Sequence, residues 1–290
     1  MLGPGGHLNL AATVLVTAST VFIVLKAAGD TSINDHTCHD DPSTKLAYSR
    51  HELEDLNFFS QELLQMKRLM RLEANMVFAD VGAYDGKYVI PLAYEVLPHG
   101  KAYATDVVEG GSAHEGSVKW RGSGYGTAVI EARVEEHNVC AWQSCTTYSK
   151  YDYRPTLNVS VALATPDDVG LPAGCCDAIM LRTSYHHIQK PFVALRQFER
   201  ALKPGGRLLI IENHPQGGQD AEGVPENRAG MGIDGRIVLD EVKVALGWEP
   251  VPQDVLDEIS ATMGWEPVRM DEWPMTRFGA QYAFLFMKPM

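Results

Sequence analysis

The sequence of 290 residues has no cluster of lysine and arginine, and its acidic side chains outnumber the basic ones by 37 to 25. The net charge of −12 opposes a broad electrostatic grip on a phosphate backbone, so we expect no nucleic-acid partner. Residues 1–25 contain no arginine, which disfavours a mitochondrial presequence and a location in the mitochondrial matrix. No internal repeat is visible, and the length suits one α/β domain with a sizeable core.

No two cysteines have the C-x-x-C spacing that is typical of zinc sites, so we predict no metal site. Cys140 and Cys145 fall in an aromatic-rich segment, 140–153, that we expect to be irregular. They form a disulfide if the domain is exported, or otherwise remain free thiols. The five cysteines are Cys38, Cys140, Cys145, Cys175 and Cys176.

Long uncharged apolar runs are also scarce, and the one at the N-terminus spans residues 8–25. Its 18 residues lie at the lower limit for a membrane-spanning helix. Small residues at 27–29 would suit signal cleavage instead. We therefore predict an N-terminal segment over 1–28 that is a signal-anchor, a cleaved signal peptide, or a buried or artefactual extension. The first two place the protein on a membrane by a single pass, or in the secretory pathway or outside the cell.

A polar linker is predicted over 29–45, and the main domain over 46–290 with an insertion around 110–155. Within the domain, the pattern of 77–86 predicts a short strand, a loop with Gly82 and Gly86, and then a helix. Such a loop lets a nucleotide-like ligand approach backbone N–H groups at the start of the helix. A second strand over 101–106 ends in Asp106, where a carboxylate is well placed to accept both hydroxyls of a ribose.

Further strands and helices alternate along the rest of the domain, as in α/β proteins. The fourth strand is followed by Tyr185, His186 and His187, and a Lys-Pro-Gly-Gly turn at 203–206 follows the next helix. The predicted helices span 49–74, 87–96, 127–137, 191–202 and 254–263, and the further strands begin near 158 and span 177–181, 207–212, 266–271 and 280–287.

This order of motifs resembles the class I S-adenosylmethionine-dependent methyltransferases, in a branch with Tyr-His-His after the fourth strand. Residues 80–86 match the family's D-x-G-x-G-x-G motif except at Tyr84, which replaces the middle glycine and is expected to adopt a negative φ. The resemblance implies a Rossmann-like, doubly wound sheet of seven mostly parallel strands. Helices would cover both faces, and one terminal strand would be antiparallel.

The resemblance also implies an enzyme, a methyltransferase, with S-adenosyl-L-methionine as its cofactor. Either Asp167 or Asp168 would lie near the adenine, and which of the two remains open. The residues implied for cofactor binding are Asp80, Gly82, Ala83, Gly86, Asp106, Asp167 and Asp168.

Methyl transfer from a sulfonium is an in-line displacement, for which the protein mainly positions the reactants and removes water. A general base is needed only where the acceptor loses a proton. His186 and His187 are the candidate catalytic residues, because imidazole accepts protons near pH 7. The alternative is that one caps the following helix and the other packs. The sequence does not identify the methyl acceptor.

Two other functions fit parts of the pattern. A catalytically silent binding module would explain Tyr84 in the glycine loop and the long 110–155 segment. A nucleotide-dependent oxidoreductase would share the strand, loop and helix, but the third glycine of G-x-G-x-x-G is missing.

Overall fold

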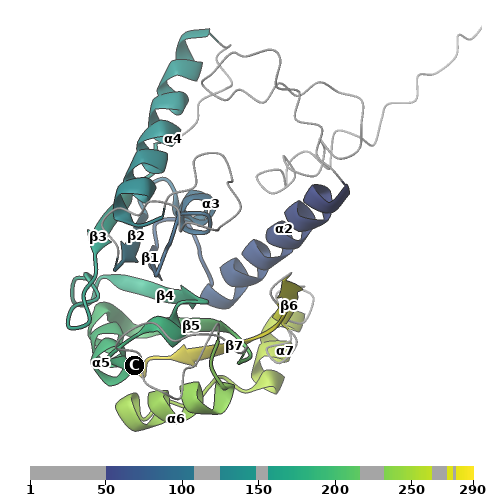
Figure 1. Cartoon of the computed structure of the whole chain (residues 1–290), viewed down its shortest axis with the longest axis vertical. Helices are drawn as coiled ribbons and strands as arrows, with labels where there is room; N and C mark the ends of the chain where they lie inside the picture. The colour runs from purple at the N-terminus through teal and green to yellow at the C-terminus, as the bar shows by residue number, and fades with distance from the viewer. Residues whose placement is uncertain (1–49, 108–124, 148–155, 216–231, 263–272, 277–278) are drawn as a thin grey trace, which may run out of the picture. The chain divides into compact units, whose positions relative to one another are not determined.

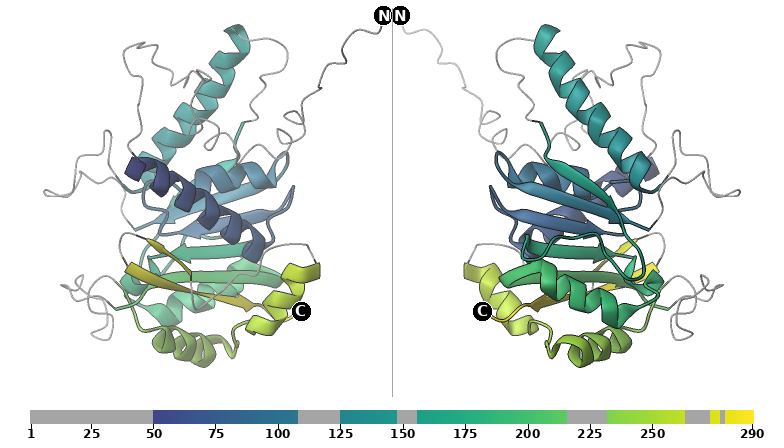
Figure 2. Two further views of the ribbon diagram at one scale, coloured as in Figure 1. Left: turned by 90° about the vertical axis from the view of Figure 1, so that its right-hand side faces the viewer. Right: turned by 90° about the vertical axis from the view of Figure 1, so that its left-hand side faces the viewer.

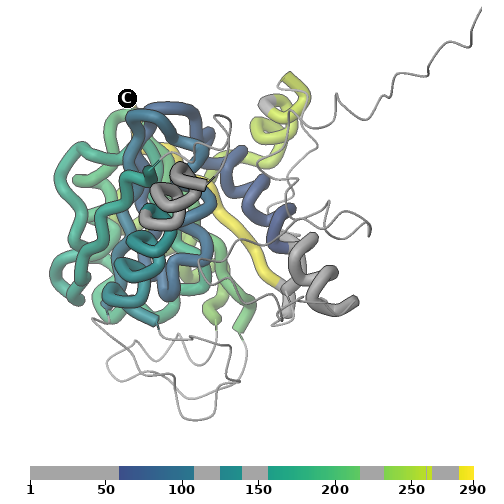
Figure 3. Tube along the Cα trace, turned by 90° about the horizontal axis from the view of Figure 1, so that it is seen from above, coloured from purple at the N-terminus to yellow at the C-terminus, as the bar shows by residue number. Residues whose placement is uncertain are grey.

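The structure is a computed structural model of the whole chain, and it describes residues 50–107, 125–147, 156–215, 232–262, 273–276 and 279–290 (Figure 3). The chain divides into two compact units, 1–62 and 63–290. In the first unit the described part is the beginning of helix α2 (Arg50–Met70), whose last turns belong to the second unit. The apolar run 8–25 and the linker 29–45 lie outside the described residues. In the segments that are described, no helix is both long and apolar enough to cross a bilayer.

A seven-stranded sheet in the order β3-β2-β1-β4-β5-β7-β6 forms the centre of the second unit (Figure 1). Strands β1 to β5 are parallel, and β7 is antiparallel to both β5 and β6. The predicted doubly wound sheet with a terminal antiparallel strand is confirmed. The strands are β1 (Val77–Val81), β2 (Lys101–Asp106), β3 (Val159–Leu163), β4 (Cys176–Arg182), β5 (Leu202–Asn213), β6 (Trp273–Thr276) and β7 (Gly279–Met287).

The strand order reverses between β1 and β4. From β1 the chain moves outward to β2 and β3, and it then returns to the other side of β1 as β4. In open α/β sheets, ligands bind beyond the carboxyl ends of the strands at such a reversal. The topology therefore directs attention to the loops that follow β1 and β4.

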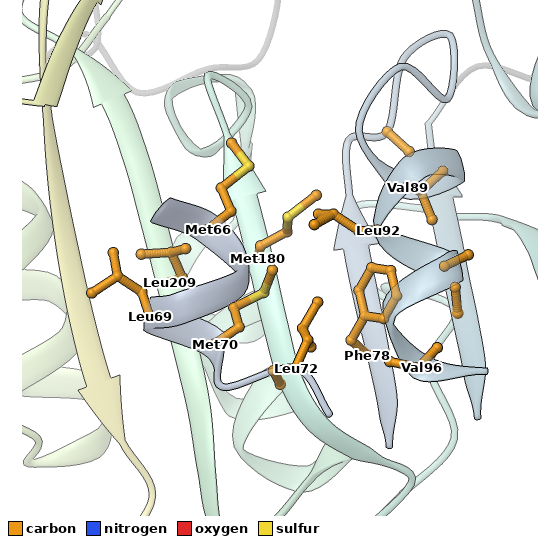
Figure 4. Packing of buried hydrophobic residues seen from close by; sticks show 14 of the residues in the cluster. Met66, Leu69, Met70, Leu72, Phe78, Val89, Leu92, Val96, Met180 and Leu209 are labelled. Atoms are coloured by element: carbon orange, nitrogen blue, oxygen red, sulfur yellow. The ribbon is translucent and has the colours of Figure 1, made fainter. Parts of the chain in front are cut away.

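Helices cover both faces of the sheet (Figure 2). Alternate strand residues point to opposite faces, so that Phe78 belongs to one core cluster and Ala79 to the other. The first cluster joins the end of α2 with α3, α4 and α7, and Figure 4 shows its side chains packed between α2, α3 and the strands. The second cluster joins α5 and α6. The helices besides α2 are α3 (Val89–Ala93), α4 (Thr127–Thr147), α5 (Pro191–Ala201), α6 (Gly235–Leu246) and α7 (Gln253–Thr262), with short 3-10 turns η4 (Tyr94–Val96) and η5 (Tyr185–His187).

The expectation that the irregular segment begins at residue 140 is wrong. Helix α4 continues to Thr147, so Cys140 and Cys145 lie in a helix. The physical reason is that residues 127–147 contain no glycine or proline, and nothing in the sequence interrupts the helix. The remainder of the predicted irregular segment, 148–153, lies outside the described residues.

The C-terminal half contains a helix that the sequence analysis missed. Helix α6 begins after Asp234, whose side chain accepts a hydrogen bond from the Arg236 N–H, and it ends at Gly247 with φ +71°. These are ordinary helix start and stop signals. The strand predicted over 266–271 falls on residues that are not described, and the strand described at the edge next to β7 is β6.

Candidate functional site

The site is built from loops at the carboxyl edge of the sheet. The N–H groups of Gly82 and Ala83 both donate to the carbonyl oxygen of Thr105, at 2.8 and 3.0 Å. The loop after β1 is thereby fixed to the end of β2. The Gly86 N–H donates to Ala83 O at 2.8 Å, and Gly86 O accepts from Ile90 N, which starts helix α3.

Tyr84 adopts a φ of +55°, so the expectation of a negative φ is wrong. Two contacts hold this left-handed backbone: the Tyr84 N–H donates to Asp106 Oδ2 at 2.9 Å, and its carbonyl accepts from Gly126 N at 2.8 Å. The ring also stacks on Tyr125, with 5.2 Å between centroids and 3° between planes. A bulky residue with positive φ is strained, and such strain gathers at functional sites.

Asp106, the acid predicted at the end of the second strand, contacts the glycine loop. Its side chain is largely buried, at 8% exposure, and its Oδ2 accepts the Tyr84 N–H. The structure therefore brings together the two features that the sequence had separated by twenty residues. Contact of Asp106 with a ribose stays a prediction.

Asp80 lies beneath the loop and is 2% exposed. Its carboxyl accepts a hydrogen bond from the Val89 N–H at the start of α3. Burial raises the pKa of Asp80 to about 8; Arg182 opposes this shift, and Asp106 and Asp85 add to it. The contact with Val89 makes Asp80 a support for the loop from below.

Asp167 and Asp168 form a tight turn after β3, next to the end of β2 through the bond from Ala164 N to Asp106 O at 2.8 Å. The Asp168 N–H donates to Thr165 Oγ1 at 2.9 Å. Asp167 pairs with Lys190 at 2.6 Å, although its side chain is 70% exposed. The turn thus lies at the predicted edge of the sheet, with both carboxylates at the surface.

The chain after β4 passes directly against the glycine loop. Ser184 Oγ donates to Val81 O at 2.8 Å. A Cβ added at Gly82 would lie 2.4 Å from Ser184 Cβ. Glycine is therefore required here by the close approach of Ser184, the residue before η5, in addition to its φ of +77°. The sequence analysis considered only the approach of a ligand to this loop.

His186 is buried, at 1% exposure, and contacts Glu212 at the end of β5. His186 Nδ1 lies 2.8 Å from Glu212 Oε2, and the His186 N–H donates to Glu212 Oε1 at 3.1 Å. His187 is exposed, and its ring centroid lies 3.9 Å from that of His186. The pKa of His187 is lowered, first by burial of part of the ring and then by His186. The sequence analysis did not select Glu212. It could have been found as an acidic residue at the carboxyl end of a predicted apolar strand.

Tyr185, the first residue of the Tyr-His-His motif, points into the core instead. It is fully buried, and its hydroxyl donates to Glu241 Oε2 on α6 at 2.7 Å. The motif therefore has a structural residue followed by two histidines at the carboxyl edge. In the part of the chain that is described, no three His, Cys, Asp or Glu side chains are close enough to hold a metal ion.

Part of the chain is similar to a known protein family. Residues 121–210 match the sequence model of a family described as "Methyltransferase domain". This part of the chain is therefore similar to a methyltransferase domain, and the motif order and sheet topology resemble those of the class I S-adenosylmethionine-dependent methyltransferases. These findings support the prediction that the protein is an enzyme and that its cofactor is S-adenosylmethionine. They do not bear on the predicted Tyr-His-His branch.

Particular relatives are more distant. The chain is 37% identical over 54 residues to the ubiquinone/menaquinone biosynthesis C-methyltransferase UbiE of Syntrophotalea carbinolica, a match that spans 19% of this chain and only 23% of that relative. Among solved structures, it is similar to an S-adenosylmethionine-dependent methyltransferase from Aquifex aeolicus, with 20% identity, coverage of 78% and 88%, and a TM-score of 0.43. Another is the phosphoethanolamine N-methyltransferase 2 of Haemonchus contortus, with 16% identity, coverage of 79% and 52%, and a TM-score of 0.46.

Proposed function

We propose that the protein binds S-adenosylmethionine at the carboxyl edge of β1, β2 and β4 and transfers its methyl group to an acceptor. The observation that carries the proposal is the hydrogen bond between Tyr84 N and Asp106 Oδ2, which joins the glycine loop to the acid after β2. This bond lies beside the reversal of strand order, in a chain part of which is similar to a methyltransferase domain.

The donors and acceptors at this edge suit the chemistry of that cofactor. Asp106 offers a carboxylate to the ribose hydroxyls, and the segment from Gly82 through Ala83 to Gly86 passes its backbone close by. The turn at 167–168 offers acceptors for the adenine amino group. Asp80 supports the loop through Val89. When bound, the cofactor supplies an electrophilic methyl group on a sulfonium.

The residues of the chain then have limited tasks. They hold the two reactants in line and keep water away from the methyl group. His186 and His187 are the candidates for proton transfer, because both follow β4 at the same edge as the loop. The methyl acceptor itself stays unidentified.

The direct test is isothermal titration of the full-length protein with S-adenosylmethionine, with NADH titrated in parallel. We expect saturable binding of the first ligand and none of the second. An absence of heat at millimolar S-adenosylmethionine would remove the proposal, and saturable NADH binding would favour the oxidoreductase.

A silent cofactor-binding module is a second candidate, favoured by the strained Tyr84 in the glycine loop. Incubation of the protein with cofactor labelled on its methyl group in a cell lysate separates the two functions. Transfer of label to any acceptor supports the enzyme. Saturable binding without transfer supports the silent module.

For the N-terminal part of the chain, we propose that residues 8–25 direct the protein to a membrane or into the secretory pathway. The support is the uncharged run in the sequence. Under this proposal the membrane is a partner only if the run is not cleaved.

A further inference from the structure

Glu212 has three hydrogen-bond partners on its two carboxyl oxygens. The His186 N–H donates to Oε1 at 3.1 Å, the Asn213 N–H donates to Oε2 at 3.2 Å, and His186 Nδ1 lies 2.8 Å from Oε2. All three residues are nearly inaccessible to solvent. Two of these partners are backbone N–H groups, which can only donate, so both carboxyl oxygens already act as acceptors.

This network favours one position for the imidazole proton, on Nδ1. An accepting Glu212 requires Nδ1 to carry a proton, and a neutral imidazole then has its lone pair on Nε2. His186 Nε2 is buried and has no hydrogen-bond partner among the described residues. A buried polar atom without a hydrogen-bond partner is unfavourable unless a ligand or water supplies one. In this tautomer Nε2 is a proton acceptor.

The chain next to His186 lies at the proposed cofactor site. His186 is two residues beyond Ser184, which hydrogen-bonds to Val81 O and contacts the space above Gly82. Glu212 lies at the carboxyl end of β5, next to β4 in the sheet. The titratable groups that the described contacts place against the imidazole are Glu212 from β5 and His187 from its own turn.

We propose that His186 Nε2 is the general base that removes a proton from the methyl acceptor, with Glu212 as the positioning residue that fixes the tautomer. In the step, the X–H bond of the acceptor breaks and its proton moves to Nε2. The electron pair left on X forms the new bond to the methyl carbon, and the carbon–sulfur bond breaks with its electron pair remaining on sulfur. The substrate class is therefore an acceptor with an exchangeable proton, such as a hydroxyl or an amine, and not a thioether or a tertiary amine. This inference rests on the proposed methyltransferase function.

The first test needs neither cofactor nor acceptor. Nitrogen-15 NMR of the histidine rings in the full-length protein at pH 7.5 reports which ring nitrogen is protonated, and the His186→Gln spectrum assigns the signal. We expect Nδ1–H with an unprotonated Nε2, and a shift toward the other tautomer in Glu212→Gln, because an amide can donate to Nδ1. A wild-type His186 that carries its proton on Nε2, or on both nitrogens, would overturn the proposal.

The second test measures transfer of labelled methyl to catechol, tryptamine and dimethyl sulfide. We expect transfer to a proton-bearing probe to fall by about 10²–10⁴-fold in His186→Gln. In Glu212→Gln we expect a lower kcat and a displaced pH–rate profile. The matched control is His99→Gln, an exposed histidine between η4 and the start of β2, which should keep the wild-type rate.

Cofactor titration of each variant separates this inference from the proposed function. If the wild type does not bind S-adenosylmethionine, the proposed function fails. If His186→Gln binds the cofactor as the wild type does and keeps the wild-type rate, only the general base fails. Methylation of dimethyl sulfide alone would also overturn the inference. If no probe is methylated, the tautomer of His186 in the NMR spectrum decides whether the inference stands. The same spectrum is used if His186→Gln does not fold, and the Glu212→Gln spectrum then assigns the His186 signal.

Discussion

Gly82 is constrained both by its left-handed backbone, at φ +77°, and by Ser184. A methyl group would come within 2.4 Å of Ser184 Cβ and would displace the turn that carries His186. Gly174 has a similar φ of +60°, but nothing lies within 4 Å of its added Cβ. Alanine substitution at these two positions therefore distinguishes the cost of backbone strain from the cost of steric overlap.

We therefore predict that Gly82→Ala lowers the free energy of unfolding by about 2–4 kcal/mol, from strain and overlap together, and weakens cofactor binding. Gly174→Ala should lose only about 1–2 kcal/mol and bind normally. Urea unfolding and calorimetric titration give the two quantities. Equal losses in both variants would show that Ser184 yields without consequence.

Asp106 is predicted to contribute to binding through its charge. Asp106→Asn keeps the shape of the side chain but removes a charged acceptor, so cofactor binding should weaken by about 1.5–3 kcal/mol, or roughly 10- to 150-fold. The control is Asp240→Asn on the exposed side of α6, which should bind as the wild type does. Unchanged affinity in the Asp106 variant would mean that the ribose is held elsewhere.

The raised pKa of Asp80 predicts a pH-dependent stability. With a pKa of about 8 when folded and about 3.9 when unfolded, the folded state retains a proton that the unfolded state releases between these values. Its contribution is complete below about pH 4 and is lost as the pH rises toward 8. Relative to Asp80→Asn, the wild type should lose up to about 1.4 kcal/mol of unfolding free energy per pH unit. Urea titrations at pH 5 and pH 8 measure this, and parallel pH dependences would contradict it.

At the scale of elements, η5 is fastened to α6 by the buried hydrogen bond from Tyr185 to Glu241. Tyr185→Phe removes a donor from a buried carboxyl group, so the unfolding free energy should fall by about 1–3 kcal/mol. Tyr103→Phe, a partly buried tyrosine on β2, is the matched control and should change it little. An unchanged urea midpoint in the Tyr185 variant would show that the bond is not needed to hold the turn.

Patterns of neighbouring residues predicted most of the sheet, because most strands contain a short run of apolar residues. The bounds of β2 agree with the prediction, β1 lies where a short strand was expected, and β4 and β5 each extend beyond the predicted strands. The φ expected for Tyr84 was wrong because the acceptor of its N–H, Asp106, and its stacking partner, Tyr125, lie 22 and 41 positions away. The link between His186 and Glu212 was missed for the same reason. Loop position could be predicted from sequence, whereas the contacts of the loop depend on which strands become neighbours.

For the molecule as a whole, residues 8–25 are proposed to set its location in the cell. At 1.5 Å per residue, 18 helical residues span about 27 Å, slightly less than the ~30 Å hydrocarbon core. We predict that the uncleaved protein sediments with membranes and resists carbonate extraction, since slight bilayer thinning compensates for the difference. If the segment is a signal peptide, N-terminal sequencing should find a soluble chain that begins near residue 30. A freely soluble protein that still starts with Met1 would contradict both outcomes.

During synthesis on a ribosome, β5 emerges long before its second neighbour in the sheet. Its buried residues Leu208 to Ile211 are covered at one edge by β7, which begins only at Gly279. Strand β6 precedes β7 but is hydrogen-bonded to β7 and not to β5, so it does not cover the edge earlier. Until β7 arrives, the nascent chain presents an apolar strand with unpaired backbone groups, a template for aggregation. The yield of folded protein should therefore depend on chaperone supply and on the speed of translation between these two strands.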